Sequence, residues 1–316
     1  MAYQLHEINE AIHQDVHGFL DQCDALYQSR VSEAVDAIME NMKNSQIVLL
    51  SGPSGSGKTT TALKIEQELR NRGILSHTVS MDNYFRTLTK ENAPRNEDGD
   101  IDFESPNYMD MELLLEHFGR LEQGEEVLVP KFEFARQMRN DSLGYPLRLK
   151  ENEIAIFEGI HALNDDIAGR HKGATGIYIS ARSDVENGSS VLFKGTWMRL
   201  VRRAVRDHQF RGTGVGETLT MWANVRRGEK LYISPFKDRA KVTIDSSFPY
   251  EVSVMKNFAK PLLEAVLLDV PEDSPRREEL VTLISAFTEF EAIDPALVSP
   301  DSLIREFIGG GSYTYK

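Results

Sequence analysis

Residues 47–59 read IVLLSGPSGSGKT, and this stretch decides the fold. The apolar run 47–51 leads into a glycine-rich loop, and the sequence TTALKIEQELRNRG (60–73) that follows has helical character and stops at a glycine. The loop matches the pattern G-x-x-x-x-G-K-[ST] in the strand, loop and helix context that the pattern requires. Its backbone N–H groups and the start of the helix form a site for a phosphate group. The stretch therefore predicts a nucleotide-binding α/β protein.

Further apolar runs continue the alternation of strands and helices. Each is short and bounded by polar or turn-forming residues: HTVSM (77–81), EVLVPKF (126–132), EIAIF (153–157), GIYIS (176–180) and AKVTIDS (240–246). Strands that alternate with helices form a parallel sheet covered on both faces. We therefore predict an α/β fold of the P-loop NTPase type, a parallel β-sheet with helices on both faces. The polar stretch 86–107 predicts a long loop, of the kind that is often functional.

Helical additions are expected at both ends of this core. Residues 5–42 contain no proline and repeat apolar residues at helical spacing, so 1–44 are predicted to form a helical N-terminal lead. After a main domain over 45–257, the patterns KPLLEAVLLDV (260–270) and REELVTLISAFTEF (277–290) predict a helical C-terminal extension over 258–316. The ending GGGSYTYK is expected to fray.

The composition argues against several classes of protein. A net charge of -13 is unusual for a nucleic-acid-binding protein, because affinity for polyanions comes from clustered Lys and Arg. The single cysteine, Cys23, allows no internal disulfide, and no secretory signal or membrane-spanning apolar run is present. The guanine-reading motif Asn-Lys-x-Asp of switch GTPases does not follow the predicted strands. We expect a cytoplasmic protein that binds neither nucleic acid nor membrane.

Two acidic residues follow predicted strands at the edge where the glycine-rich loop is expected. Asp82 comes directly after 77–81, and Glu158 directly after 153–157. Ligands of an open parallel sheet bind at the carboxyl ends of strands, so both acids should face the loop. Phosphoryl transfer to an alcohol needs a carboxylate at the hydroxyl, magnesium, and cations around the phosphates. We predict that Asp82 is the base, that Lys58 contacts the phosphates, and that Thr59 and Glu158 hold magnesium.

Several arginines lie close together in the sequence RLVRRAVRDHQFR (199–211). On a helical wheel Arg199, Arg202, Arg203 and Arg206 share an arc of about 100°, and the apolar residues occupy the opposite side. We predict one packed face and one cationic face that binds phosphate oxygens, on a lid over about 195–216 with a hinge at 211–214. The alternative is a solvated helix face whose arginines pair with surface acids.

Together these motifs resemble the uridine/cytidine kinase branch of the phosphoribulokinase and uridine kinase family. The resemblance covers roughly 45–255 and rests on GPSGSGKTT, SMDNYF, DFESP, VPKFEF, IFEGIHAL and RLVRRAVRDHQFRG, which occur in the family's order. Segments 221–240 and 246–251, and IREFIGG near the end, resemble long bacterial uridine kinase-like members. The resemblance implies an ATP-dependent P-loop kinase that uses magnesium and phosphorylates a small molecule, and it leaves a homo-oligomer open.

The resemblance also implies roles for individual residues. Asp82 would be the catalytic base and Glu158 the acid on the metal side, while Arg203, Arg206 and Arg211 would lie on the lid. Lys58, Arg203 and Arg206 are therefore expected to act on the transferred phosphoryl group. The residues expected to bind ATP are Gly52, Ser54, Gly55, Ser56, Gly57, Lys58, Thr59, Thr60 and Arg211.

The acceptor pocket departs from the family's pattern. Glu104 in DFESP stands where the family has an aspartate that holds ribose hydroxyls, and Phe132 stands in place of a tyrosine, with Glu133 after it in place of an aspartate. Gln137 aligns with a histidine that reads the pyrimidine, and Phe85 aligns with a tyrosine. The lost hydroxyls and imidazole were hydrogen-bond partners for the substrate. Phe85 and Phe132 can stack on a ring or pack as core aromatics. The expected substrate-binding residues are Asp82, Phe85, Glu104, Phe132, Gln137 and Arg203.

The sequence thus predicts transfer of the γ-phosphate of ATP to the 5′-hydroxyl of a ribonucleoside, with uridine or cytidine as the first candidates. Two alternatives stay open. The same chemistry can act on a non-nucleoside alcohol, such as a sugar or a pantothenate-like compound. The chain can also be a non-catalytic nucleotide-binding regulatory module, although Asp82 and the lid arginines count against this, since binding alone needs neither.

Overall fold

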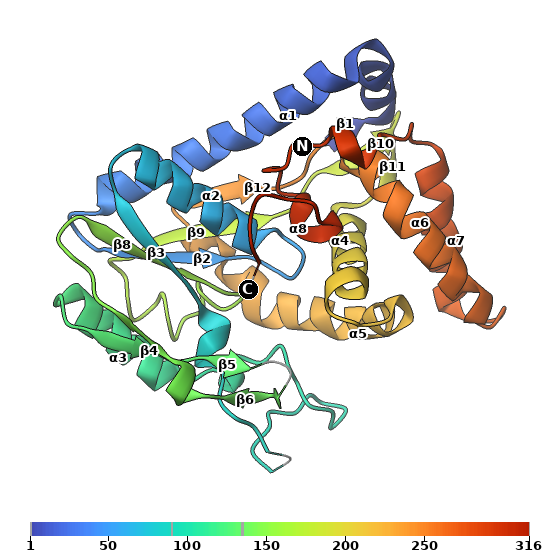
Figure 1. Cartoon of the computed structure of the whole chain (residues 1–316). Helices are drawn as coiled ribbons and strands as arrows, with labels where there is room; N and C mark the ends of the chain where they lie inside the picture. The colour runs from blue at the N-terminus through green and yellow to red at the C-terminus, as the bar shows by residue number, and fades with distance from the viewer. Residues whose placement is uncertain (1, 90, 134–135, 316) are drawn as a thin grey trace.

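A parallel sheet forms the centre of the computed structural model, which describes residues 2–89, 91–133 and 136–315 (Figure 1). Its strands, in sheet order, are β12 (Val242–Asp245), β9 (Thr175–Ser180), β2 (Ile47–Ser51), β8 (Glu153–Glu158) and β3 (Leu75–Ser80). Every neighbouring pair is parallel. Because β2 is the middle strand, the glycine-rich loop that follows it opens at the centre of the carboxyl edge. The predicted parallel α/β sheet is confirmed.

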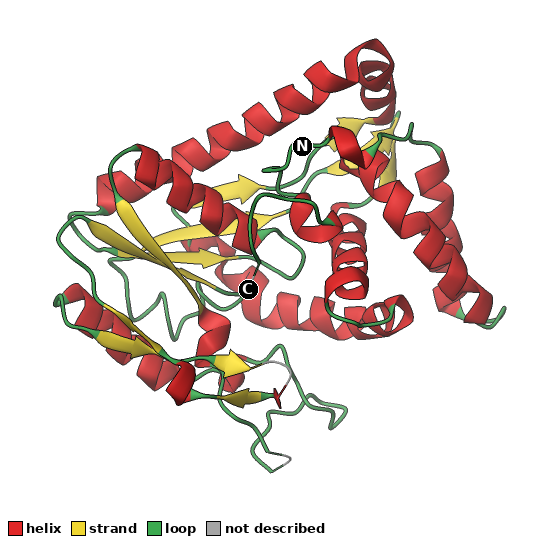
Figure 2. Cartoon of the chain, viewed as in Figure 1, coloured by secondary structure: helices red, strands yellow, loops and turns green. Residues whose placement is uncertain are grey.

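Alternate side chains of β2 enter two separate cores, which explains why this strand is apolar along its length. Val48 and Leu50 join one core, and Ile47 and Leu49 join the other. The second core is covered by α3 (Met111–Glu122). The first core is covered by α1 (Leu5–Asn41), α2 (Lys58–Asn71), α4 (Gly195–Phe210) and α6 (Glu251–Asp269). Both faces of the sheet therefore carry helices, as predicted, and Figure 2 shows this layering.

The predicted strand 126–132 does not belong to the central sheet, so that prediction was wrong. Its residues 127–129 form β4 (Val127–Val129), which pairs antiparallel with β7 (Tyr145–Leu147) in a separate two-stranded sheet. A second small pair follows, β5 (Phe132–Glu133) with β6 (Met138–Arg139). Pro130 lies between β4 and β5, and proline cannot donate a ladder hydrogen bond, so the run is broken into two short strands.

The N-terminal helix was predicted correctly in extent but not in shape. In α1 the residue Asp15 has φ −159° and ψ 89°, which is not helical, and its Oδ1 accepts from the N–H of Gly18 at 3.0 Å. A carboxylate that caps the N–H three residues later starts a new helix, so α1 is kinked here.

The strand β1 (Ala2–Gln4) was not predicted; it pairs parallel with β10 (Asp184–Asn187), which forms a hairpin with β11 (Ser190–Phe193).

The C-terminal part contains the two predicted helices and then returns to the phosphate loop. α6 includes 260–269, and α7 (Pro275–Thr288) includes most of 277–290. The chain then forms the short α8 (Arg305–Ile308) beside α4, and in Figure 1 the final residues run towards α2. The tail was expected to fray, but its described part contacts α2, where the hydroxyl of Tyr313 donates to Gln67 Oε1 at 2.9 Å.

Among the described residues, no helix combines the length and the apolar character needed to cross a membrane.

Candidate active site

The glycine-rich loop has a backbone that only glycine permits at several points. Gly55 and Gly57 have φ of 75° and 82°, in the left-handed region that side chains disfavour. A Cβ atom on Gly52 would lie 2.1 Å from the carbonyl oxygen of Ile179 in β9. Lys58 is the first residue of α2, and its Nζ donates to a loop carbonyl at 3.4 Å. The loop therefore combines a tight turn, a helix start and a lysine, which is the arrangement that binds phosphate.

Two arginines of α4 hold carbonyl oxygens of this loop. Arg199 Nη1 donates to the carbonyl of Ser54 at 3.2 Å, and Arg202 Nη1 donates to that of Gly55 at 3.1 Å. A buried carbonyl needs a hydrogen-bond partner, and a carbonyl turned towards a phosphate would repel it. The arginines satisfy both requirements, since they bind the carbonyls from the protein side of the loop.

These two arginines are buried and paired, which corrects the predicted cationic face. Arg199 and Arg202 are 2% and 0% exposed. Arg199 Nη2 lies 2.7 Å from Glu229, and Arg202 contacts both carboxylate oxygens of the buried Glu251 at 2.5 and 2.6 Å. The arginines do share one side of the helix, but at these positions that side packs against the loop. The partner acids lie 30 and 49 residues further along the chain, beyond the reach of a local pattern.

The segment SSFPYE (246–251) completes this support. Ser246 Oγ donates to the carbonyl of Ser56 at 2.7 Å, and the backbone carbonyl of Ser246 accepts from Arg202 at 2.7 Å. Glu251, the first residue of α6, supplies the carboxylate that pairs with Arg202. Sequence reasoning noticed this segment only as a resemblance to long bacterial members. Its position directly after a strand of the parallel sheet was the signal that could have assigned it to the phosphate loop.

The two predicted acids meet Lys58 at the carboxyl edge of the sheet. Asp82 lies on the short 3-10 helix Met81–Tyr84 after β3, and Glu158 is the last residue of β8. Burial raises the pKa of Asp82, and the positive charge of Lys58 opposes this shift. Burial also raises the pKa of Glu158 to about 7, again against the effect of Lys58. Burial lowers the pKa of Lys58, while both acids raise it. The three groups therefore share one poorly solvated site.

Three further arginines surround Asp207, a 3% exposed acid near the end of α4. Its carboxylate oxygens lie 3.3 Å from Arg203 Nε, 2.7 Å from Arg206 Nη2 and 3.6 Å from Arg211 Nε. Asp207 thus neutralises part of the positive charge of these arginines. The alternative drawn from the sequence also paired the arginines of this helix with acids, but with acids at the surface. Arg203 also donates to the side-chain oxygen of Ser54 at 3.1 Å, so the cluster reaches the loop.

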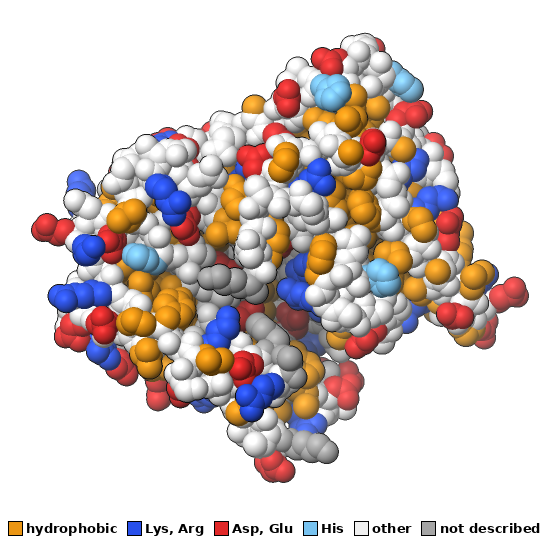
Figure 3. All heavy atoms as spheres, in the orientation of Figure 1, with side chains coloured by type: hydrophobic (Ala, Val, Ile, Leu, Met, Phe, Trp, Pro, Cys, Tyr) orange, Lys and Arg blue, Asp and Glu red, His pale blue; other side chains and the backbone are white. Residues whose placement is uncertain are grey.

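The charge of this cluster extends to the catalytic candidates. Arg206 lowers the pKa of Lys58, after the larger effects of burial and the acids, and Arg211 lowers that of Asp82, after burial and Lys58. Figure 3 shows Lys and Arg side chains beside a hollow near the middle of the drawn face. Thr59 lies partly buried in the first turn of α2, next to Lys58. The structure therefore brings the predicted phosphate, metal and base residues into one region.

Glu104 joins the same electrostatic cluster from the long loop. Burial raises the pKa of its carboxyl group to about 7; Arg203 and Lys58 lower this pKa, and Asp82 raises it. Gln137, in contrast, is exposed on the turn between β5 and β6, with φ of 51°. Phe134, the last residue of the VPKFEF motif, lies outside the described residues.

The two predicted substrate aromatics pack against each other. The rings of Phe85 and Phe132 meet edge to face, with centroids 5.6 Å apart, and Phe85 also meets Tyr108 at 5.3 Å. Phe132 is 3% exposed, whereas Phe85 is partly exposed. Phe132 is therefore a core aromatic, and Phe85 is the one of the two that retains an accessible surface.

Asp102 is a residue of the DFESP motif that sequence reasoning missed. It is 4% exposed, accepts from the Tyr232 hydroxyl at 3.0 Å and pairs with Arg227 at 2.9 Å. Arg227 lies on α5 (Val215–Gly228), and Tyr232 lies on the π-helical turn Glu229–Ile233 that follows. A Cβ atom on Gly228 would lie 2.3 Å from the Cβ atom of Glu104. The acceptor-side loop is thus docked on α5, and this docking positions Glu104.

Comparisons with known proteins show which proteins this chain is similar to. The model of the phosphoribulokinase/uridine kinase family matches residues 47–252. The uridine kinase of Staphylococcus aureus (strain JH9) is 26% identical over 214 residues, which are 67% of this chain and 93% of that protein. A provisionally named fructose transport system kinase of Silicibacter sp. TM1040 has a TM-score of 0.46 and 21% identity, over 64% of this chain and 95% of that chain. A possible uridine kinase from Bacillus stearothermophilus has a TM-score of 0.41 and 18% identity, over 66% of this chain and 98% of that chain.

The family match begins at β2 and ends in the first turn of α6. It therefore includes the phosphate loop, both acids at the strand ends, and the arginines of α4. The chain belongs to the phosphoribulokinase/uridine kinase family, and it is a kinase that transfers phosphoryl groups to small molecules.

Proposed function

We propose that this kinase transfers the γ-phosphate of ATP to the 5′-hydroxyl of a ribonucleoside, with uridine or cytidine as the first candidates. The main support is the position of Asp82, which lies close to Lys58 and Arg211 at the end of β3. The similarity to a uridine kinase over two thirds of the chain supports the choice of acceptor.

In this proposal Asp82 is the general base. Burial raises its pKa, so its carboxylate is more basic than an exposed aspartate and better suited to accept the proton of an alcohol. The acceptor O–H bond breaks, its oxygen forms a bond to the γ-phosphorus, and the bond between this phosphorus and the bridging oxygen of ADP breaks. The proton remains on Asp82 until solvent removes it, and ADP leaves with the electron pair of the broken bond.

The cations of the site stabilise the transferred group. Lys58 contacts the β- and γ-phosphates, and Arg203 and Arg206 approach from the end of α4. We place any closing movement at the hinge 211–214, since α4 before it is fixed to the phosphate loop through Arg199, Arg202 and Arg203. Gly212, with φ of 66°, lies between α4 and α5 and provides a hinge.

Thr59 and Glu158 are the residues that would hold magnesium. No group of three or more His, Cys, Asp or Glu side chains that could hold a metal occurs among the described residues. This donor set still fits magnesium, which is usually bound by one or two carboxylates together with substrate phosphates and water. Burial raises the pKa of Glu158, and the negative charges of Asp82 and Glu306 add to this shift; a divalent cation would offset both effects. When bound, magnesium would neutralise charge on the phosphates.

Glu104 is the residue proposed to bind the sugar hydroxyls of the acceptor. Its carboxyl group lies in the cluster with Asp82 and Arg203. The loop that carries Glu104 is held in place because the neighbouring Asp102 pairs with Arg227 on α5. Phe85 is the partly exposed aromatic proposed to contact the base, and the buried Phe132 packs against it edge to face. Gln137 remains a proposed contact on the exposed turn.

A non-nucleoside alcohol is the second candidate acceptor. The observation that favours it is the packing of Phe132 in the core, which leaves fewer groups to recognise a flat base. Glu104 would bind the hydroxyls of a sugar or a pantothenate-like compound equally well, because a carboxylate recognises a diol without reading a base.

The test is ADP release by the purified protein with ATP and magnesium against a panel of nucleosides, sugars and pantothenate. We expect uridine or cytidine to stimulate ADP release most. Stimulation by a sugar or pantothenate alone would replace the acceptor and keep the mechanism. If ATP binds and no member of the panel increases ADP release, the proposed acceptor class is wrong, and the regulatory-module alternative gains support.

A further inference from the structure

The C-terminal segment 299–315 lies against the phosphate loop and the first turn of α2. A Cβ atom on Gly57 would lie 2.6 Å from a side-chain atom of Leu303, so this leucine sits directly on the loop. The hydroxyl of Tyr315 is 3.1 Å from Thr60 Oγ1. In Figure 1 the end of the chain lies close to the start of α2. Residues far from the family match therefore contact the nucleotide site.

Glu306 makes the most specific of these contacts. Its Oε2 accepts from the backbone N–H of Thr60 at 3.2 Å and from Thr60 Oγ1 at 2.6 Å. Thr60 is the third residue of α2, and N–H groups in the first turn of a helix have no carbonyl partner within the helix. These N–H groups attract anions, and in a phosphate loop they bind the phosphates of the nucleotide. The carboxylate of Glu306 occupies such a position.

The charge of Glu306 is also felt by the catalytic candidates. It raises the pKa of Lys58, after burial and the charges of Glu158 and Asp82, and it adds to the raised pKa of Glu158. A carboxylate this close to the phosphate site would repel a nucleotide, whose phosphates carry the same sign of charge. Glu306 and a nucleotide phosphate therefore compete for Thr60.

Packing keeps Glu306 in this position. Leu303, Ile304 and Phe307 are fully buried, and Glu306 itself is 9% exposed. Phe307 also stacks its ring under the guanidinium of Arg202, at 5.1 Å. The contact with Thr60 is thus part of the folded core and does not depend on a loose tail.

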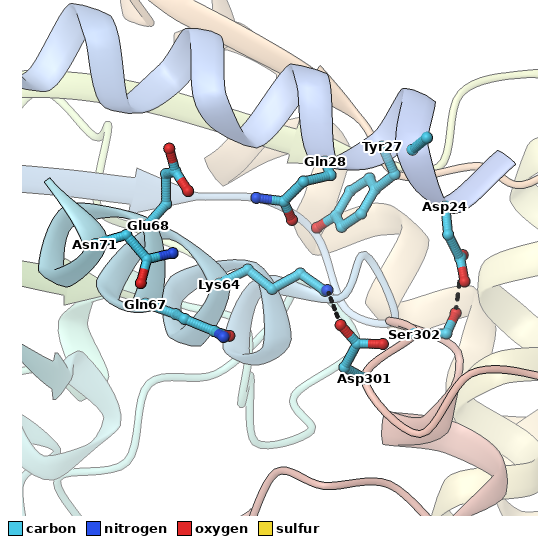
Figure 4. A pocket seen from close by; sticks show the side chains of 10 residues that line it. Asp24, Tyr27, Gln28, Lys64, Gln67, Glu68, Asn71, Asp301 and Ser302 are labelled. Carbon is cyan, nitrogen blue, oxygen red and sulfur yellow. Dashed lines mark hydrogen bonds and ion pairs between the residues drawn. The ribbon is translucent and has the colours of Figure 1, made fainter. Parts of the chain in front are cut away.

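The start of the C-terminal segment, at Asp301 and Ser302, is held by polar contacts. Lys64 Nζ lies 3.4 Å from Asp301, and Ser302 Oγ contacts Asp24 at 3.4 Å, as Figure 4 shows. These residues border a cavity of about 300 Å³ between α1, α2 and the segment. Ser302 is 2% exposed and also shares a hydrogen bond of 2.9 Å with the Tyr250 hydroxyl, so polar contacts hold this end of the segment beside the cavity.

We propose that Glu306 is an internal competitor of the nucleotide, and that the C-terminal segment restrains the kinase until ATP displaces this carboxylate from Thr60. The proposal relies on the nucleotide site of the proposed function and not on the acceptor. It assigns a regulatory role to a part of the chain that lies beyond the family match.

The test compares ATP affinity in wild type, Glu306→Gln and Glu306→Ala, measured by titration with a fluorescent ATP analogue without acceptor. We expect the Kd to fall about tenfold in both variants, because a hydrogen bond to a charged group changes an equilibrium by roughly this factor. Glu291→Gln is the matched control, since it makes the same change on an exposed side chain of the same extension, next to His13. Its Kd should equal that of wild type. An unchanged or higher Kd in both Glu306 variants would overturn the proposal.

Hydrogen exchange gives a second measurement that does not need a variant. Addition of ATP to the wild-type protein should speed backbone exchange in 299–311, because the segment loses its contact with Thr60. Slower exchange there would overturn the proposal, since it would mean that the segment helps to bind the nucleotide.

The two proposals can fail separately. If no acceptor is phosphorylated but Glu306→Gln binds ATP more tightly than wild type, the proposed function fails and this inference stands. If an acceptor is phosphorylated and all of the proteins bind ATP equally, this inference fails and the function stands.

Discussion

The phosphate side and the acceptor side of the site are built in different ways. On the phosphate side, Arg202 and Glu251 are both fully buried, and the arginine binds a loop carbonyl. On the acceptor side, the described residues of the long loop 86–107 lie largely at the surface; Phe103 is 61% exposed, and Gln137, just before β6, is exposed as well.

This difference teaches which parts of a kinase can vary in sequence. A buried charge is costly without its partner, so each member of the phosphate-side network constrains the others. Exposed loop residues carry no such constraint, and their replacement changes recognition at little cost in stability. The predicted phosphoryl-transfer groups can therefore stay while an exposed residue such as Gln137 replaces the histidine expected from the family's pattern.

The largest effect is expected at Asp82, where the two sides meet. Asp82→Asn should lower kcat by about 10²- to 10⁴-fold, because the amide cannot accept the acceptor proton. ATP affinity should change little, since no role in nucleotide binding is proposed for this side chain. Turnover is measured by ADP release, and affinity by titration. Asp141→Asn, an exposed carboxylate paired with Arg139, is the control and should keep full turnover. Undiminished turnover of Asp82→Asn would remove this residue from the mechanism.

The next effect tests the buried network of the phosphate side. Arg202→Met should lower the free energy of unfolding by about 3–5 kcal/mol, because Glu251 is left buried without its cation. The double variant Arg202→Met with Glu251→Leu should recover part of this loss, since no unpaired charge remains. Urea unfolding of the three proteins measures this. If the double variant is less stable than Arg202→Met, the unpaired charge is not the cause.

A pH series tests whether Glu158, on the phosphate side, has a raised pKa in the folded protein. The folded protein raises the pKa of Glu158 from 4.5 to about 7, so it holds this proton more firmly than the unfolded chain does. The stability that this group contributes is complete below about pH 4.5 and is lost as the pH rises to about 7. Glu158→Gln should therefore match wild type near pH 4 and exceed it by about 1–3 kcal/mol near pH 8, measured by urea unfolding without nucleotide.

Glu153, at the other end of β8, is the contrasting control. Against the effect of burial, hydrogen bonds from His77 and the Lys150 backbone lower its pKa. Stability from a lowered carboxyl pKa is present above its ordinary value, so Glu153→Gln should lose stability near pH 8. Equal pH dependence of both variants would contradict the assignment of opposite environments.

The smallest effect is expected on the acceptor side. Glu104→Ala should raise KM for the acceptor about tenfold, the usual range for one lost hydrogen bond to a charged group, with ATP affinity nearly unchanged. Glu97→Ala, an exposed residue of the same loop, is the control and should leave both constants unchanged. A larger effect of Glu104→Ala on ATP affinity than on the acceptor KM would place this residue on the phosphate side and break the comparison.

Local sequence determined the phosphate loop, the five strands of the parallel sheet and the two acids at the strand ends. A glycine loop between an apolar strand and a helix is a local pattern, and the residue after a strand lies at the edge of the sheet whatever surrounds it. The helices α1, α6 and α7 were also predictable, because apolar residues recur at helical spacing. The strand 126–132 was misassigned because an apolar run does not reveal which strand it pairs with.

Only the tertiary structure decided what the charged residues do. Arg202 reads as part of a cationic face in the sequence, but its partner Glu251 lies 49 residues away and turns it into a buried support of the phosphate loop. Glu306 lies 246 residues from Thr60, and nothing in its local sequence indicates a contact with a phosphate site. A charged side chain has no fixed role in a local pattern, because its pKa, its burial and its partner all depend on segments that folding brings together from distant parts of the chain.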